Sequence, residues 1–168
     1  MIRAARPDDV RTIATFIREL ADYEKLTAEC AVDEAKLREH LFGARPCVEA
    51  LLACDGETPV GFALFLQTYS TFKTSPCLYL EDLFVQPHAR GHGHGAALLR
   101  RLAAIAVARG LPRFDWSVLD WNELAIDFYR RLGAQVMPDW RICRLQGDAL
   151  LRVAHGDVSP TDLRSKPR

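Results

Sequence analysis

Two acidic residues and three glycines lie close together in residues 81–96, in the stretch EDLFVQPHARGHGHGA. The acids, Glu81 and Asp82, could accept a proton or hold a cation. The glycines, at positions 91, 93 and 95, remove side chains where the backbone must approach a ligand, and a helix expected to begin near Gly95 points free N–H groups into this loop. Such a loop suits an anion, and a pyrophosphate fits it well.

Other kinds of loop share part of this glycine pattern. Residues 91–96, GHGHGA, satisfy the G-x-G-x-x-[G/A] spacing of dinucleotide-binding folds. That fingerprint places its first glycine tightly against the end of a strand, whereas five residues separate Val85 from Gly91 here. The G-K-[S/T] of a P-loop is absent. A surface turn without a ligand remains an alternative, which the strand before the loop and the long helix after it disfavour.

Apolar periodicity and turn residues predict the elements that hold this loop. Helices are expected at residues 9–26, 32–43, 96–109 and 122–134, and strands at residues 1–5, 47–55, 60–69, 77–85, 113–121 and 140–146. A polar tail is expected over residues 155–168. The order of these elements predicts a mixed α/β (α+β) fold, in which helices cover both faces of one sheet.

The composition disfavours several classes of partner. The 168 residues include 22 basic and 22 acidic side chains, so no net charge favours nucleic acid or an anionic membrane surface. No apolar run is long enough for a signal peptide or a transmembrane helix, which predicts a cytoplasmic protein. The five cysteines show no C-x-x-C pair, so we expect reduced core thiols rather than disulfides or a metal site.

The sequence R-G-x-G-x-G after an apolar strand resembles the acetyl-coenzyme A (acetyl-CoA) loop of the GNAT superfamily of N-acetyltransferases. Six segments resemble, in order and spacing, the diamine/polyamine and thialysine branch of that family: RELADYEKL, TYSTFK, YLEDLFV, ARGHGHG, LDWNELAIDFYRRLGA and RLQGDAL. The resemblance covers residues 1–154 and implies one GNAT domain with a mixed, mostly antiparallel sheet. It also implies acetyl transfer to the primary amine of a small molecule, such as a lysine-like amino acid, a diamine or a polyamine.

The resemblance implies acetyl-CoA as the co-substrate and assigns residues to it. The pyrophosphate is assigned to Arg90 and to the backbone amides of Gly91, His92, Gly93, His94, Gly95 and Ala96. The pantetheine arm is assigned to Leu83, Phe84 and Val85, with which it pairs like an added strand. Asn122 has two interpretations, the N-cap of a helix or a further cofactor contact.

The chemical difficulty of this reaction is that an amine is normally an ammonium ion. A model amine of pKa about 10.4 is only about one part in a thousand neutral near pH 7, so deprotonation represents roughly 4–5 kcal/mol. By resemblance, Glu81 is the base, acting through water, and Asp82 holds the substrate charge or the local structure. Strand alternation sends the two acids to opposite faces unless a bulge intervenes, and an exposed strand acid is the alternative for Glu81.

The resemblance also supplies an acid. In the family, the tyrosine at the position of Tyr129 protonates the departing sulfur of coenzyme A, and a phenol of pKa about 10 remains a proton donor at neutral pH. Asn122 and Tyr129 are seven residues apart, so they lie on one face of the expected helix. Without the family register, a tyrosine that follows a phenylalanine in a helix is ordinary core packing.

Substrate recognition is assigned to Tyr23 and Glu24, which align with an amine-contacting pair of the family, together with Glu81 and Asp82. The alternative for Tyr23 and Glu24 is the polar end of the first helix. Ser70 departs from the polyamine enzymes, which carry an acid in this loop, and the loss of this acid weakens recognition of a long polycation. The histidines at 88, 92 and 94 lack a nearby carboxylate pattern, so no metal is expected.

The resemblance further implies a homodimer whose active sites lie near the subunit interface. Two other functions remain open. A protein-lysine or N-terminal acetyltransferase would need an open groove rather than an acid-lined pocket. A catalytically silent module that binds acyl-CoA would keep the glycine loop without needing Glu81 or Tyr129. No spacing rule in the sequence encodes which amine is acetylated.

Overall fold

The computed structural model describes residues 1–157, and the chain divides into two compact units, Met1–Leu119 and Asp120–Arg168. The elements of the first unit are β1 (Ile2–Ala4), α1 (Val10–Tyr23), α2 (Glu34–Phe42), β2 (Glu49–Asp55), β3 (Thr58–Ser70), β4 (Ser75–Val85), α3 (His94–Ala108) and β5 (Phe114–Trp116). Short 3₁₀ turns lie at Pro7–Asp9, Thr27–Glu29 and Pro87–Ala89. The predicted helices and strands of this unit are therefore present, although β5 is shorter than expected.

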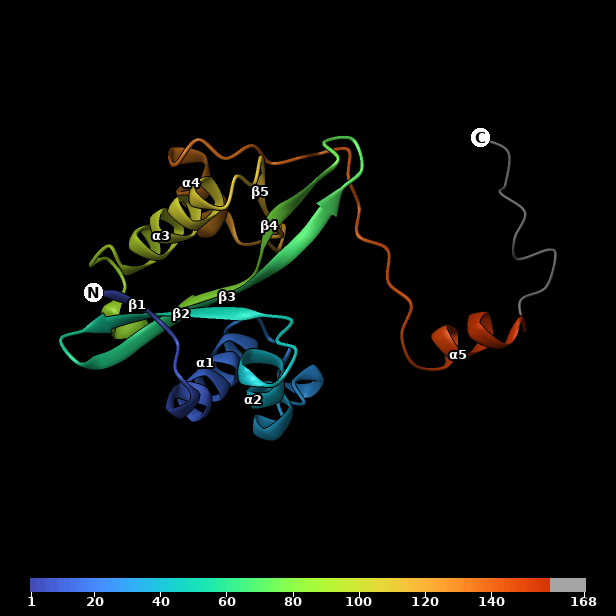
Figure 1. The fold of residues 1–168 in the computed structure, drawn as a ribbon, viewed down its shortest axis with the longest axis horizontal. Helices are drawn as coiled ribbons and strands as arrows, with labels where there is room; N and C mark the ends of the chain where they lie inside the picture. The colour runs from blue at the N-terminus through green and yellow to red at the C-terminus, as the bar shows by residue number, and fades with distance from the viewer. Residues whose placement is uncertain (158–168) are drawn as a thin grey trace. The chain divides into compact units, whose positions relative to one another are not determined.

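The five strands form one sheet in the order β1-β2-β3-β4-β5. All neighbours are antiparallel except β4 and β5, which are parallel. Helices α1 and α2 lie on one face of this sheet and α3 lies on the other (Figure 1). The mixed, mostly antiparallel α/β architecture expected from the sequence is confirmed.

Helix α1 binds the sheet through an apolar stripe. Ile13, Phe16 and Leu20 repeat at helical spacing, and all three are buried in a cluster with side chains of β2, β3 and β4. The ring of Phe16 stacks on that of Phe62, with 6.0 Å between their centroids. This packing fixes the position of α1, and hence of the residues at its C-terminal end, against the centre of the sheet.

Strand β4 contains a β-bulge at Glu81. Along the β3–β4 ladder, Asp82 lies opposite Leu64 and Leu80 lies opposite Phe65, so Glu81 is the extra residue. Paired residues share a face of the sheet, and Leu64 belongs to the cluster under α1. The bulge therefore resets the alternation of the strand, and Asp82 faces α1.

The two parallel strands pair over a short distance only. Leu78, Tyr79 and Leu80 of β4 lie opposite the three residues of β5. Beyond Leu80, no strand in the described part of the chain pairs with this edge of β4. The backbone groups of the segment Leu83–Val85 that point away from β3 are therefore left without a partner strand, and this segment ends at the glycine loop.

The second unit contains α4 (Glu123–Arg131) and α5 (Gly147–His155). The strand predicted at residues 140–146 is wrong, because this segment has no regular secondary structure. A strand forms only when a second backbone supplies hydrogen bonds, and none of the described strands pairs with it. Helix α5 was not expected, and the predicted polar tail lies outside the described residues from position 158 onward.

Two further expectations concern cysteines and membranes. Cys54 and Cys77 are buried, as expected of core thiols, whereas Cys47 and Cys143 are exposed. Over residues 1–157, no helix combines the length and the apolar character needed to cross a membrane.

We predict that deletion of Glu81 leaves the sheet intact, because Leu80 and Asp82 would then occupy consecutive positions opposite Phe65 and Leu64. The free energy of unfolding should fall by no more than about 2 kcal/mol, as measured by urea denaturation. Deletion of Tyr79, which lies in regular ladder on both sides of β4, is the control and should prevent folding. Equal damage from the two deletions would contradict the bulge.

Candidate active site

The loop between β4 and α3 is shaped by glycine. Gly91 and Gly93 have φ angles of +82° and +81°, in the left-handed region that other residues rarely adopt. A Cβ atom at either position would meet no atom within 4 Å, so the backbone conformation, and not crowding, requires glycine there. Gly93 is the N-cap of α3, and no side chain caps this helix. The first N–H groups of a 15-residue helix are therefore left for an anion.

Arg90 lies at the start of this loop and has three contacts in the first unit. Its Nε donates a hydrogen bond to the backbone oxygen of Val85 at 2.9 Å. Its guanidinium carbon lies 4.6 Å from the centroid of the Tyr23 ring and 5.7 Å from that of Phe84. The structure thus joins Arg90, assigned to the cofactor, with Tyr23, assigned to the amine.

A pocket of about 210 Å³ lies between the end of α1 and strand β4. Glu24 and Asp82, both predicted to bind the substrate, line it together. The other lining residues are Ile17, Leu20, Ala21, Leu26, Glu29 and Cys30. Glu29 and Cys30 were not predicted, since they follow α1 in a short 3₁₀ turn that no sequence pattern connects to the site.

Two carboxyl groups that line this pocket, those of Asp82 and Glu24, have raised pKa values. Burial raises the pKa of Asp82 to about 6, and the neighbouring charges of Glu81 and Glu24 add to this shift. Burial also raises the pKa of Glu24. No basic side chain of the described residues forms an ion pair with either acid. A cation bound in the pocket would therefore stabilise the charged forms of Asp82 and Glu24.

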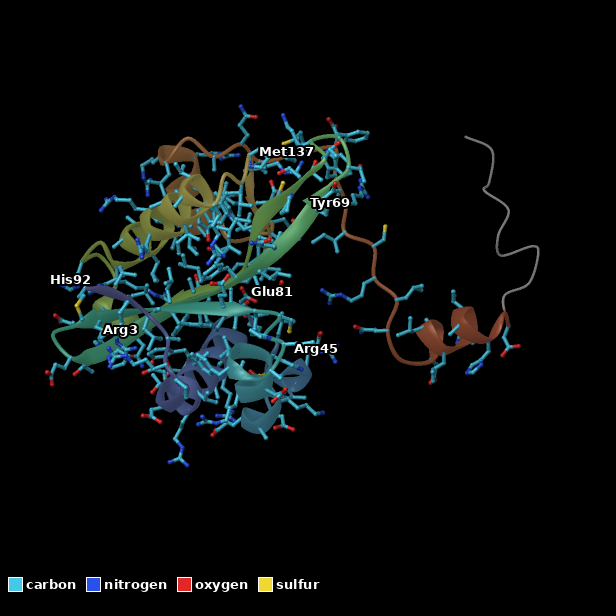
Figure 2. All side chains as sticks on the ribbon, in the orientation of Figure 1. Arg3, Arg45, Tyr69, Glu81, His92 and Met137 are labelled. Carbon is cyan, nitrogen blue, oxygen red and sulfur yellow. The ribbon has the colours of Figure 1, made fainter. Side chains whose placement is uncertain are left out.

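Glu81 occupies a different environment from Asp82. It is exposed at the bulge, whereas Asp82 is half-buried. Figure 2 shows Glu81 on β4 in the middle of the first unit, and His92 at the edge of that unit. Glu81 can therefore contact solvent water while Asp82 contacts a ligand in the pocket.

Asn122 and Tyr129 belong to the second unit. The side-chain oxygen of Asn122 accepts a hydrogen bond from the backbone N–H of Ala125 at 3.2 Å, so its interpretation as the N-cap of α4 is confirmed. Tyr129 lies in the second turn of the same helix and is half-buried. Their proposed contacts with the cofactor stay predictions.

Ser70 has a structural role in this chain. It is buried at the end of β3, and its hydroxyl oxygen accepts a hydrogen bond from the backbone N–H of Lys73 at 3.3 Å. Ser70 therefore stabilises the turn between β3 and β4. The acid expected in this loop of a polyamine enzyme is replaced by a turn-forming hydroxyl.

The histidines of the loop do not form a metal site with neighbouring ligands. The ring centroids of His92 and His94 are 6.5 Å apart. Across residues 1–157, no group of three or more His, Cys, Asp or Glu side chains is placed to hold a metal ion.

Comparison with known proteins gives consistent matches. The acetyltransferase (GNAT) family model matches residues 13–134. A thialysine N-epsilon-acetyltransferase of Bos taurus is 38% identical over 165 residues, covering 92% of this chain and 96% of the bovine protein. An L-ornithine N5-acetyltransferase of Arabidopsis thaliana is 33% identical over 194 residues, covering 89% of this chain and 85% of the plant protein.

A solved structure extends these matches to the fold. An integron cassette protein from the mobile metagenome of V. cholerae superposes with a TM-score of 0.76 and is 28% identical in sequence, covering 92% of this chain and 96% of that protein. The region matched by the family model contains both the acidic pocket and the glycine loop.

We predict that Asp82→Asn stabilises the protein at pH 7 and removes part of its pH dependence. The folded-state pKa of Asp82, about 6, exceeds its ordinary value of 3.8, so the folded state holds this proton more tightly than the unfolded state. The free energy of unfolding must then decrease as the pH rises from about 4 to about 6, and the variant lacks this decrease. Urea denaturation at several pH values measures it.

Asp55→Asn is the matched control for this prediction, because Asp55 is an exposed aspartate at the end of β2. It should follow the wild-type pH dependence. If the difference between wild type and Asp82→Asn were constant from pH 4 to pH 7, Asp82 would not have the raised pKa.

Proposed function

Because this chain belongs to the GNAT acetyltransferase family, we propose that it transfers the acetyl group of acetyl-CoA to the primary amine of a small molecule. Amino acids of the thialysine or ornithine type are the favoured substrates, and diamines are the second choice. The observation that carries the proposal is the acidic pocket lined by Glu24 and Asp82, at the strand that leads into the glycine loop.

The first unit has the features that acetyl-CoA requires. The uncapped N-terminus of α3 and the left-handed backbone at Gly91 and Gly93 suit the pyrophosphate, with Arg90 and the amides as far as Ala96 as its ligands. The unpaired edge of β4 at Leu83–Val85 suits the amide groups of the pantetheine arm. When bound, acetyl-CoA supplies a thioester as the acetyl donor.

The pocket favours a small ammonium substrate. Its volume, about 210 Å³, lies below the ~300–1,000 Å³ typical of sites for drug-sized ligands. Glu24 and Asp82 provide negative charge for an ammonium group, while Ile17 and Leu20 contact a short aliphatic chain. These features disfavour a protein-lysine or N-terminal substrate, which requires a groove for a peptide.

The proton leaves the attacking amine through the acidic residues at the bulge. We assign Glu81 as the base that accepts it by way of water, because Glu81 is exposed next to the pocket. Asp82 holds the ammonium form and orients the nitrogen. The amine nitrogen then attacks the thioester carbonyl directly, the C–S bond breaks, and Tyr129 donates a proton to the departing thiolate.

Polyamines are less favoured as substrates than short amines. The turn that contains Ser70 offers no acid to a second, distant ammonium group, because Ser70 is buried and bonded to the turn backbone. A long polycation would lack this contact, whereas an amino acid or a short diamine would not need it.

The homodimer implied by the family also belongs to this proposal. Large apolar side chains are exposed in the second unit, among them Met137, Trp140, Ile142, Leu150 and Leu151. Exposed apolar side chains of this kind favour a protein partner, and a second copy of the chain would cover them. Light scattering should give a mass of twice 18.9 kDa, and a monomer mass would contradict the dimer.

A coenzyme A release assay tests the proposed function. Acetyl-CoA is supplied with thialysine, lysine, ornithine, short diamines, spermidine, spermine and a histone-tail peptide in separate reactions. We expect turnover with a small amino acid or diamine, little with spermine, and none with the peptide. Preferred turnover of the peptide would contradict the proposal.

Tyr129→Phe distinguishes an enzyme from a silent acyl-CoA-binding module. Removing the phenolic O–H should lower kcat more than about tenfold, since general acid catalysis contributes ~10²–10⁴-fold, while acetyl-CoA affinity changes little. Tyr69→Phe is the control, because Tyr69 is exposed at the end of β3 and is assigned no chemistry. Unchanged turnover in Tyr129→Phe would remove Tyr129 from the mechanism.

A further inference from the structure

Two side chains that flank the 3₁₀ turn after β4 reach back to α1. The Nε2 group of Gln86 donates to both carboxylate oxygens of Glu19, at 3.2 and 3.1 Å. The guanidinium of Arg90 lies over the ring of Tyr23, 4.6 Å from its centroid. We call these four residues, Glu19, Tyr23, Gln86 and Arg90, the latch.

The two residues that the latch takes from α1 and the two that it takes from the segment after β4 have the same sequence spacing, four residues. Glu19 and Tyr23 are four residues apart in α1 and therefore lie on one face of this helix. Gln86 and Arg90 lie on either side of the 3₁₀ turn Pro87–Ala89, whose Ala89 is buried and anchors the turn. The latch therefore joins one helix face to one short segment at two points, which resists rotation as well as separation.

Each side of the latch continues directly into one of the two sites. On α1, Tyr23 is the last helical residue, and Glu24 next to it lines the acidic pocket. On the other side, Arg90 precedes Gly91 of the glycine loop. Apart from its Nε bond to Val85, the Arg90 side chain donates no hydrogen bond to another described residue, so its terminal nitrogens can bind phosphate while its face covers Tyr23.

The end of α1 has a strained backbone. Lys25, two residues after Tyr23, has a φ of +62°, which is unfavourable for a residue with a side chain. A conformation of this kind persists only where surrounding contacts hold it. The latch lies beside this segment, so its strength affects how well Glu24 is held in the pocket.

We infer that the latch couples the two sites, so that coenzyme A bound at the glycine loop raises the affinity of the acidic pocket for an amine. Phosphate bound by Arg90 holds its guanidinium over Tyr23, and the ordered end of α1 then holds Glu24 opposite Asp82. The inference rests on the proposed function, since it takes the amine as the ligand of the pocket. Glu19 and Gln86 act as positioning residues that touch neither ligand.

Calorimetry tests this coupling. The affinity for thialysine is measured with and without saturating coenzyme A, which lacks the acetyl group and prevents turnover. We expect coenzyme A to tighten thialysine binding by about fivefold or more in the wild type, the lower end of typical couplings. In Glu19→Ala, coenzyme A should tighten thialysine binding by less than about twofold. The affinity of this variant for coenzyme A alone should stay within about threefold of the wild-type value.

Two further sets of variants distinguish loss of the latch contacts from a general effect of substitution on the fold. Glu57→Ala is the matched control, because Glu57 is exposed in the turn between β2 and β3 and touches neither site. It should keep the wild-type coupling. Gln86→Ala and the double variant with Glu19→Ala should match Glu19→Ala alone, because each substitution removes the same hydrogen bonds.

Hydrogen–deuterium exchange provides a readout that needs no amine. Coenzyme A alone should slow exchange of the backbone amides of residues 19–30 in the wild type but not in Glu19→Ala. If this protection occurs and thialysine and the other amines do not bind, the latch responds to the cofactor and the proposed amine substrate is wrong. If an amine is acetylated but coenzyme A changes neither its affinity nor the exchange, the latch inference is overturned.

Discussion

The site depends on one irregularity, the β-bulge at Glu81. Without an extra residue in β4, regular alternation from Leu80 would place Glu81 opposite Leu64, on the face under α1, and would send Asp82 to the other face. The bulge turns Asp82 toward α1 and leaves Glu81 exposed. One adjacent pair of acids thereby gains two roles, one carboxylate that holds charge in a pocket and one in contact with water.

The rest of the first unit supports this arrangement. The apolar stripe of α1 packs on the same face of the sheet that Asp82 occupies, so the helix end brings Glu24 to the pocket. Strand β4 then continues past its short pairing with β5 into the glycine loop. The acidic pocket and the glycine loop are thus adjacent along one strand, and the contacts of Gln86 and Arg90 with α1 link them.

Much of this arrangement could be predicted from the sequence. The helix stripe of α1, the hairpin of β2 and β3, and the loop glycines follow from local periodicity and backbone preference, which the chain encodes residue by residue. Asn122 as a helix cap follows equally from a local rule. The resemblance to a known family added Glu24 as a substrate residue, and in the structure Glu24 lines the same pocket as Asp82.

Features that depend on distant partners could not be predicted. The sequence alone did not determine whether β4 has a bulge at Glu81, because the bulge depends on the register between β4 and β3. The contact of Gln86 with Glu19 spans 67 residues and has no local pattern. Residues 140–146 have apolar residues at strand-like positions, yet in the described structure they find no strand to pair with and remain irregular.

The most direct test of the account is a carbon-13 NMR titration of the Asp82 carboxyl group, with and without a bound amine. The account predicts a pKa near 6 in the free protein, raised by burial and by the charges of Glu81 and Glu24. It predicts a clear decrease in this pKa when an ammonium group enters the pocket, because the cation stabilises the carboxylate. An Asp82 pKa near 4 that does not respond to the amine would contradict it.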